Sequence, residues 1–500
     1  MLFNSYEFLL LFLPLVLAGF FLLHQQSRRL ALAWITASSL VFYGYWDYRY
    51  LALIIPSIVI NCALGYLIAR HWSRAWLIAG VAANLAVIGW FKYSLFLYLV
   101  VTNGATPPDF LKGIVLPLGI SFFTFQQISY LVNVWRGHEQ PARLETHAFI
   151  VLFFPHLIAG PIVLYENIAW QVRRRPRLAG YLTASFKIGL LIFAIGLFKK
   201  VVIADSLAPF ANAVFTYAVR SDTVISAKDA WLGAAAYSLQ LYFDFSGYSD
   251  MAIGLGRMFG FRLPVNFNSP YKAANIIEFW HRWHITLSSF FRNYVYIPLG
   301  GNRRGRRQQL AFILIVFFLT GLWHGAAWAF IAWGVTHGVL VVINHAWSRA
   351  MPGRLRSLLA GSPMARKAYN CVAWGLTATC VTLLWVPFRA ESLPVALKMI
   401  GAMLNPFVRT YSRVFPDINL YLVLWISLVG LHLWCWCAPN TQTFVRYVRR
   451  LRRGGGAVIM GGHKSDVAAG WVYTCVVGVA LYLSFASIGY VKSEFIYFNF

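Results

Sequence analysis

The most informative residues of this chain lie in two short stretches, Phe279-Trp-His-Arg-Trp-His-Ile-Thr-Leu-Ser288 and Gly321-Leu-Trp-His-Gly325. Their histidines, His284 and His324, are 40 residues apart, in or beside very apolar sequence. Imidazole titrates near neutral pH, and an ionisable side chain is costly to place in hydrocarbon. An ionisable residue inside a membrane is therefore a functional-site hypothesis by default, and these two histidines are the first candidates.

The composition identifies a membrane protein. Of the 500 residues, 59% are hydrophobic and only 12% are charged, against about 25% charged in soluble globular proteins. Runs of roughly 18–20 apolar residues recur along the chain, and a helix of that length crosses a bilayer core of about 30 Å. We predict an all-α polytopic protein and find no internal repeat or soluble domain. Residues 1–500 are interpreted as a single integral membrane domain.

The net charge of +27 would suggest nucleic-acid binding in a soluble protein. Here the basic residues cluster in short stretches between apolar runs, as in the cytoplasmic loops of a multi-pass inner membrane protein. Anionic lipid headgroups are the expected partner of this charge, and nucleic acid is not expected. The six cysteines form no C-x-x-C pair, so neither a disulfide framework nor a cysteine nucleophile is expected.

Apolar runs predict roughly ten or eleven crossings. They lie at about 6–23, 31–46, 50–69, 75–100, 114–133, 182–203, 229–250, 309–347 (an outward and a returning helix), 370–388, 419–437 and 469–489. The first run lacks a cleavage site and is expected to remain as a span. The stretch 149–165 contains Pro155, Gly160, Pro161 and His156, and it predicts a re-entrant segment because such breaks require protein or water to satisfy the freed backbone.

The part of the membrane domain that holds the candidate catalytic residues extends over about residues 229–347. Asp244 and Asp250 are expected to face the interior, where each pairs with an arginine or orients a histidine. From 257 to 307 the sequence has nine arginines and lysines and only one acid, Glu278, without a clean span. Short interfacial helices are predicted there, with a basic face that suits an anionic ligand on the cytoplasmic side.

Three roles are open to the histidines. One is general base catalysis, in which imidazole takes the proton of a hydroxyl that attacks a carbonyl. The second is metal ligation by His281, His284 and His324, and the third is a hydrogen-bonded structural role for each ring. Metal ligation is the weakest, because a membrane element separates two of the ligands from the third and no carboxylate has ligand spacing beside them. No metal is expected.

Several further motifs resemble the membrane-bound O-acyltransferase family. They are Asp244-Phe-Ser-Gly-Tyr-Ser-Asp-Met-Ala-Ile-Gly254, Pro264-Val-Asn-Phe-Asn268, Tyr296-Ile-Pro-Leu-Gly-Gly-Asn-Arg303, Phe153-Phe-Pro-His-Leu-Ile-Ala-Gly-Pro-Ile162 and the closing Phe495-Ile-Tyr-Phe-Asn-Phe500, together with the two histidine stretches. The resemblance is strongest to the bacterial branch that contains the membrane subunit of alginate O-acetylation. It implies a ring of transmembrane helices around a central tunnel that joins the cytoplasm and the exterior.

The resemblance also implies acyl transfer, usually of acetyl, from a cytoplasmic thioester such as acetyl-CoA to an acceptor outside the cytoplasm. His324 falls on the family's catalytic histidine and His284 on its assisting histidine. His281 stands where the branch usually has arginine and is therefore not expected to be essential. Asp244, Trp323, Arg292 and Asn293 are candidate substrate-binding residues. No bound cofactor is expected, since the thioester is a substrate.

The expected acceptor is a secreted exopolysaccharide of the alginate or cellulose type, with peptidoglycan or teichoic acid as further possibilities. The acetyl group reaches it directly or through an extracytoplasmic partner protein, for which segment 389–416 and an exposed C-terminal tail are candidate docking surfaces. The alternative is a transporter or flippase, which would have inverted repeats, or a scaffold subunit of a polysaccharide export complex.

Overall fold

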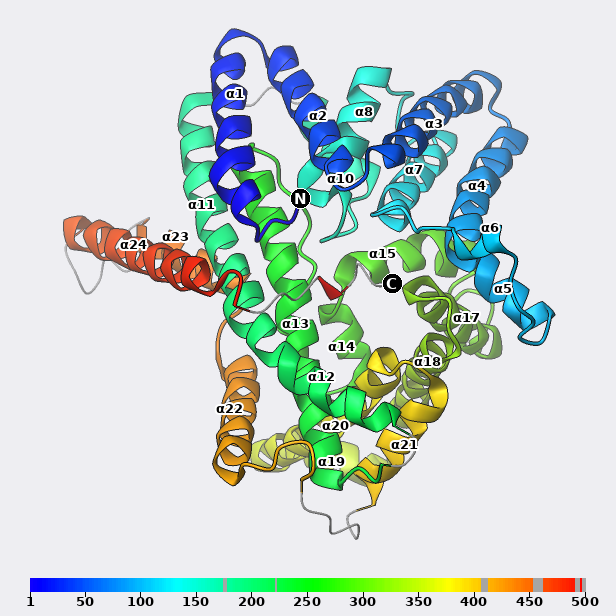
Figure 1. Ribbon diagram of the computed structural model, residues 1–500, viewed down its shortest axis with the longest axis vertical. Coiled ribbons are helices and arrows are strands. Elements are labelled where there is room, and N and C mark those ends of the chain that lie inside the picture. The colour runs from blue at the N-terminus through cyan, green and yellow to red at the C-terminus, as the bar shows by residue number, and fades with distance from the viewer. Residues whose placement is uncertain (174–177, 221–222, 406–411, 453–461, 491–494, 497–500) are drawn as a thin grey trace. The chain divides into compact units, whose positions relative to one another are not determined.

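The computed structural model describes residues 1–173, 178–220, 223–405, 412–452, 462–490 and 495–496. Every regular element within these ranges is a helix. The chain forms two compact units (Figure 1). Unit 1 comprises Met1–Val201, Ser246–Val265 and Val445–Tyr490, and unit 2 comprises Val202–Phe245, Asn266–Phe444 and Val491–Phe500. The single domain expected from the sequence stays a prediction.

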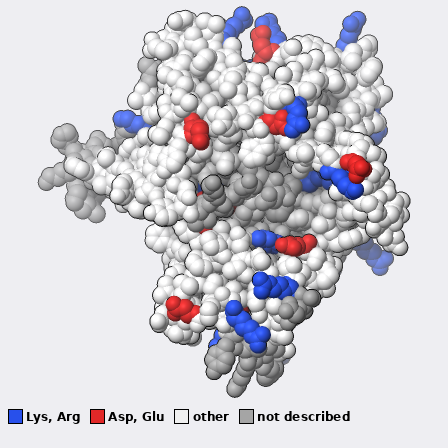
Figure 2. Space-filling view, in the orientation of Figure 1, with Lys and Arg blue, Asp and Glu red and all other residues white. Residues whose placement is uncertain are grey.

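The helices confirm a multi-pass membrane protein. Eight helical segments in the described ranges are long and apolar enough to span a bilayer: Glu7–Gln26, Tyr48–His71, Arg74–Val101, Arg306–His324, Trp328–Ala350, Pro363–Arg389, Ile418–Cys437 and Gly470–Ser487. Two further predicted spans are helices of 17 and 16 residues, α2 (Arg28–Gly44) and α7 (Ile120–Trp135). On the face shown in Figure 2, charged side chains are few and scattered over a mostly uncharged surface, as contact with lipid requires.

Unit 1 is built from an N-terminal series of helices and the returning α24. Helix α1 (Leu13–Gln26) packs against α2, and Figure 1 shows the two as antiparallel neighbours. Helix α7 is buried along most of its length and packs against both α3 (Leu51–His71) and α4 (Arg74–Ile88). The other elements are η1 (Glu7–Phe12), η2 (Tyr48–Tyr50), η3 (Gly89–Tyr93), α5 (Ser94–Val101), α6 (Asp109–Lys112), α11 (Leu178–Phe198) and α24 (Gly462–Ser487), which packs against α11.

The predicted break within 149–165 is confirmed. Helix α8 (Leu144–Leu152) ends, the four-residue α9 (Phe154–Leu157) has Pro155 in its first turn, and an irregular stretch leads to α10 (Tyr165–Arg173). The stretch is buried in protein throughout, as non-helical backbone at membrane depth must be. The hydroxyl of Ser39 accepts a hydrogen bond from the freed Phe154 N–H at 3.2 Å.

Helix α13 (Ala227–Met258) has 32 residues, and its part from Ser246 onward belongs to unit 1. It crosses α11 with glycine against glycine: a Cβ added at Gly196 would lie 2.6 Å from the carbonyl oxygen of Gly247. Close by, Lys199 Nζ lies 2.7 Å from Asp250 Oδ2. Lys199 opens the π-helix η4 (Lys199–Ala204). Lys199 is thus one partner of Asp250, whereas the sequence predicts an arginine or a histidine.

We expect Gly247→Val to destabilise the protein strongly. A side chain there would meet Gly196 O at 2.7 Å and Lys200 N at 3.0 Å, and backbone atoms cannot move aside as a side chain can. Overpacking costs about 1–3 kcal/mol or more. Gly375→Val, in α20 (Pro363–Arg389), is the matched control because a Cβ at Gly375 would meet no atom within 4 Å. Thermal unfolding in detergent should separate the two variants, and equal unfolding temperatures would contradict the tight crossing.

Unit 2 contains the predicted histidine stretches. Short helices occupy residues 270–299, as predicted: η5 (Pro270–Lys272), α14 (Ile276–Arg282), α15 (Ile285–Phe291), η6 (Arg292–Tyr296) and α16 (Ile297–Leu299). The predicted outward and returning helices are α17 (Arg306–His324) and α18 (Trp328–Ala350), and the chain leaves the first of them directly after His324. The remaining helices are α12 (Asp205–Val219), α19 (Gly353–Gly361), α20, α21 (Leu393–Leu404), α22 (Ile418–Cys437) and α23 (Thr441–Arg452), which begins in unit 2.

Of the two predicted docking segments, 389–416 stays a prediction and the C-terminal tail is corrected in part. In the 389–416 segment, helix α21 packs against α12 and α20, and residues 406–411 lie outside the described residues. In the C-terminal tail, Phe495 and Ile496 are buried, so the expectation of an exposed tail is wrong for these two residues. The remaining tail residues, 491–494 and 497–500, lie outside the described residues.

Candidate active site

The two predicted histidines lie together in unit 2. The imidazole centroids of His284 and His324 are 6.5 Å apart, and neither residue is more than 1% exposed. The indole of Trp323 lies 5.8 Å from the ring of His284 and 4.8 Å from that of His324. The fold therefore brings together two rings that are 40 residues apart in the chain, with a predicted substrate-binding residue in contact with both.

His284 has a backbone conformation that is uncommon for residues other than glycine. It precedes α15 as the N-cap with φ of 43° and ψ of 51°, in the left-handed region. A residue with a Cβ pays roughly 1–2 kcal/mol there, and such strain clusters at functional sites. The conformation is held from outside the helix, because the next backbone N–H, of Ile285, donates to Asn266 O at 3.0 Å.

Asn266 also fixes the ring of His284. Its Oδ1 accepts from Thr286 N–H at 3.3 Å and from the Thr286 hydroxyl at 2.8 Å, and it lies 3.1 Å from His284 Nδ1. A backbone N–H can only donate, so the atom it reaches is the amide oxygen. His284 Nδ1 must then carry the proton, which leaves the lone pair on Nε2.

Burial lowers the pKa of His284 to about 3, so the ring stays neutral at physiological pH. A ring with so low a pKa accepts a hydrogen bond but holds a proton poorly, which suits an assisting role. Asp244 and Asp250 are predicted to pair with an arginine or to orient a histidine, and the structure adds Asn266 as a partner of His284. Asn266 lies in one of the quoted family motifs, the only signal that pointed to it.

His324 is the last residue of α17, and Gly325 after it is extended. Its ring packs edge-to-face against Trp333 of α18 and Phe388 of α20, each with its centroid 5.0 Å away. Helices α17 and α18 can approach closely enough for this because Gly321 has no side chain, and a Cβ there would clash with Phe330 O. Three elements thus fix the position of the His324 ring.

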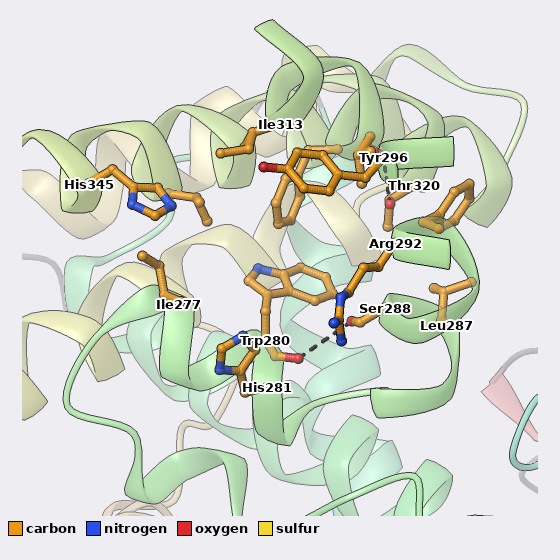
Figure 3. A pocket seen from close by; sticks show the side chains of 14 residues that line it. Ile277, Trp280, His281, Leu287, Ser288, Arg292, Tyr296, Ile313, Thr320 and His345 are labelled. Carbon is orange, nitrogen blue, oxygen red and sulfur yellow. Dashed lines mark hydrogen bonds between the residues drawn. The ribbon is translucent and has the colours of Figure 1, made fainter. Parts of the chain in front are cut away.

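A cavity of about 240 Å³ lies between α14, α15, η6, α17 and α18. It starts one helical turn from each histidine, since Thr320 precedes His324 by four residues and Ser288 follows His284 by four. Figure 3 shows Trp280 at its centre, with Arg292 and Tyr296 on one side and His345 on the other. Its polar lining residues are His281, Ser288, Arg292, Tyr296, Thr320 and His345, and none is acidic.

Trp280 links this cavity to the histidine pair through aromatic contacts. Its ring lies 5.8 Å from that of Trp333, which in turn contacts His324. Its indole N–H donates to His337 Nδ1 at 3.3 Å. His284 and His324 are not among the residues that line the cavity, and Trp280 and Trp333 connect it to the His324 ring.

The other predicted site residues are placed as follows. Arg292 is exposed and lines the cavity, while its neighbour Asn293 in η6 is half-buried and is not a lining residue. Asp244 is buried and accepts a hydrogen bond from the backbone of Ile496. His281 lines the cavity and is exposed. Over the ranges that the structure describes, no three His, Cys, Asp or Glu side chains gather as a metal site would require.

Comparisons with known proteins agree with the motifs. A sequence profile of the membrane-bound O-acyltransferase family matches residues 140–386, which include both histidines. Peptidoglycan O-acetyltransferase of Helicobacter pylori is 40% identical over 438 residues, which cover 81% of this chain and 80% of that protein. A probable alginate O-acetylase of Pseudomonas aeruginosa is 42% identical over 416 residues, or 81% and 75% of the two chains. Teichoic acid D-alanyltransferase of Streptococcus thermophilus is 31% identical over 244 residues, or 46% and 57%.

Proposed function

The chain belongs to the membrane-bound O-acyltransferase family, and from this premise we propose that it moves an acetyl group from a cytoplasmic thioester to hydroxyls of a secreted polysaccharide. It is a multi-pass membrane acyltransferase, and we place it in the bacterial inner membrane. The observation that carries the proposal is the buried pair His284 and His324, with the tautomer of one ring fixed by Asn266. Such a pair suits proton transfer at a site shielded from water.

In the proposed reaction His324 is the general base. It takes the proton of the acceptor hydroxyl as the oxygen attacks the thioester carbonyl carbon. The carbon–sulfur bond then breaks, and the thiolate leaves and takes up the proton from His324. His284 Nε2 accepts a hydrogen bond in the same site and orients the reacting groups. A thioester is already activated, so positioning and one base account for much of the acceleration.

We assign the cavity beside the histidines to the donor. Its polar lining residues donate hydrogen bonds, or can both donate and accept them, and none carries a carboxylate. Such a lining favours an anionic ligand, and the other walls of the cavity are apolar. An acyl thioester such as acetyl-CoA combines phosphates with a slender, mostly neutral arm. Arg292 would meet a phosphate and Asn293 would support it from the adjoining position. No bound cofactor takes part in this scheme.

Arg292→Gln should therefore raise the KM for acetyl-CoA while leaving kcat nearly unchanged. A charge-assisted hydrogen bond contributes roughly 1.5–3 kcal/mol, which corresponds to about a 10- to 100-fold rise in KM. Arg349→Gln is the matched control, since Arg349 in α18 is exposed and does not line the cavity. Kinetics with inside-out membrane vesicles measure both constants. An unchanged KM for Arg292→Gln would remove the donor from this cavity.

The acceptor is proposed from the relatives, which are named for peptidoglycan and alginate. We favour an exopolysaccharide of the alginate or cellulose type, reached directly or through an extracytoplasmic partner protein. The test is the acetyl content of each surface polymer in a deletion strain that carries the wild-type gene or His324→Ala. Loss of acetyl from one polymer in the variant identifies the acceptor. Full restoration by a double variant of His284 and His324 would instead indicate a scaffold subunit.

A further inference from the structure

Asp244 has an unusual partner for a buried acid. The residue is 1% exposed, and its Oδ2 accepts a hydrogen bond from the backbone N–H of Ile496 at 3.0 Å. The two residues are 252 positions apart in the chain. Burying a polar group costs free energy unless it is hydrogen-bonded, so this bond stabilises both partners in place. Residues 495–496 are therefore attached to α13 at Asp244.

The attached segment lies one side chain away from the assisting histidine. Phe495, also 1% exposed, has its ring 5.9 Å from that of Phe245. Phe245, which follows Asp244 on α13, meets the His284 ring edge-to-face, with centroids 4.7 Å apart and planes at 87°. All of these residues belong to unit 2. An unbroken series of contacts thus runs from the tail to the His284 ring.

We propose that Asp244 is a positioning residue that fastens Phe495 and Ile496 beside the histidine pair, so that the tail holds His284 in its working orientation through Phe245. The inference rests on the proposed acetyl transfer. It reassigns Asp244, which the sequence analysis counted among substrate-binding residues. Asn266 holds only the Nδ1 edge of the His284 ring. The orientation of the ring therefore also depends on Phe245, which packs against it edge-to-face.

The hydrogen bond can be removed from either side. Asp244→Leu removes the acceptor and keeps a side chain of similar size, whereas Ile496→Pro removes the donor because proline has no N–H. Asp244→Asn keeps an oxygen acceptor. We expect each of the first two variants to lower kcat for acetyl transfer about 10²-fold, the effect of a misplacement near 1 Å, with the KM for acetyl-CoA unchanged. Asp244→Asn should recover most of the lost rate.

The double variant decides between a tether and separate roles. If Asp244 acts by holding Ile496, then Asp244→Leu combined with Ile496→Pro is no slower than either single variant. If the losses in kcat of the two single variants instead multiply in the double variant, the proposal is wrong. A raised KM for acetyl-CoA in Asp244→Leu alone would also overturn it, because it would indicate that Asp244 binds substrate. Size-exclusion profiles and unfolding temperatures of the detergent-purified full chains identify any variant that fails to fold, and the labelling experiment below does not depend on activity.

The second measurement tests the position of the tail. In a chain whose six native cysteines are replaced by alanine, Phe495→Cys should react slowly with a maleimide because the position is buried. Adding Asp244→Leu should make the labelling faster, and adding Asp244→Asn should not. Equal labelling in all three chains would overturn the tether. If His324→Ala transfers acetyl at the wild-type rate, the proposed function is wrong. If His324→Ala is inactive but the Asp244 and Ile496 variants transfer acetyl at the wild-type rate, only the inference about Asp244 is wrong.

Discussion

Membranes that contain His324→Ala should transfer acetyl about 10²–10⁴-fold more slowly than membranes with the wild-type chain, the range that general base catalysis contributes. The substitution removes the only proposed base, and no step of the scheme proceeds without proton removal from the attacking hydroxyl. The fold should survive, because alanine is a good helix former and position 324 ends α17. Expression level, detergent extraction and unfolding temperature check this against the rate.

His337→Gln is the matched control for that substitution. His337 is also fully buried, on α18, and its ring lies 4.9 Å from that of Trp333, which contacts His324 as well. Its Nδ1 accepts the indole hydrogen bond of Trp280, a task that a glutamine oxygen can take over. We expect this variant to keep its activity. A rate near that of the wild type for His324→Ala would show that the catalytic role is misassigned.

Asn266→Ala should lower kcat about 10²-fold and should also destabilise the protein. The variant releases His284 Nδ1 and removes the Asn266 oxygen that accepts from the buried Thr286 N–H and hydroxyl. Each such hydrogen bond contributes roughly 0.5–1.5 kcal/mol. With the Nδ1 proton no longer fixed, the ring can present the wrong tautomer or rotate, so the rate falls even in molecules that remain folded.

The control for Asn266→Ala lies two residues further along the chain. Asn268 is exposed, and its side-chain oxygen accepts a hydrogen bond from Asn440 without reaching either histidine. Asn268→Ala should leave kcat within the error of the measurement. Thermal unfolding and initial rates of acetyl transfer, measured on the same preparations, separate a lost fold from a lost orientation. A full rate for Asn266→Ala would mean that the amide does not set the tautomer of His284.

Much of the fold could be predicted because its signals are local. Apolar runs fix where helices form, and the break at Pro155 and the break after His324 follow from prolines, glycines and a change in composition over a few residues. The short helices of 270–299 were predicted from charge and the absence of a long apolar run. The histidine pair was predicted because ionisable residues are rare in such sequence.

The contacts between residues far apart in the chain could not be predicted. Lys199 pairs with an acid 51 residues away, and Asp244 binds a backbone N–H 252 residues away. Hydropathy and periodicity describe each element separately and do not specify which elements meet. Asn266 stands in an irregular segment where no periodic pattern marks a buried residue. Its role depends on three donors whose directions only the folded backbone defines.

The left-handed backbone at His284 affects how any library of substitutions at that position should be interpreted. Most amino acids disfavour this region, and β-branched ones are excluded from it most strongly, whereas asparagine and glycine accept it. Dead variants with valine or isoleucine would therefore report a misfolded turn as readily as a missing imidazole. Asparagine, which tolerates the turn but lacks the ring, is the replacement whose phenotype isolates the chemistry.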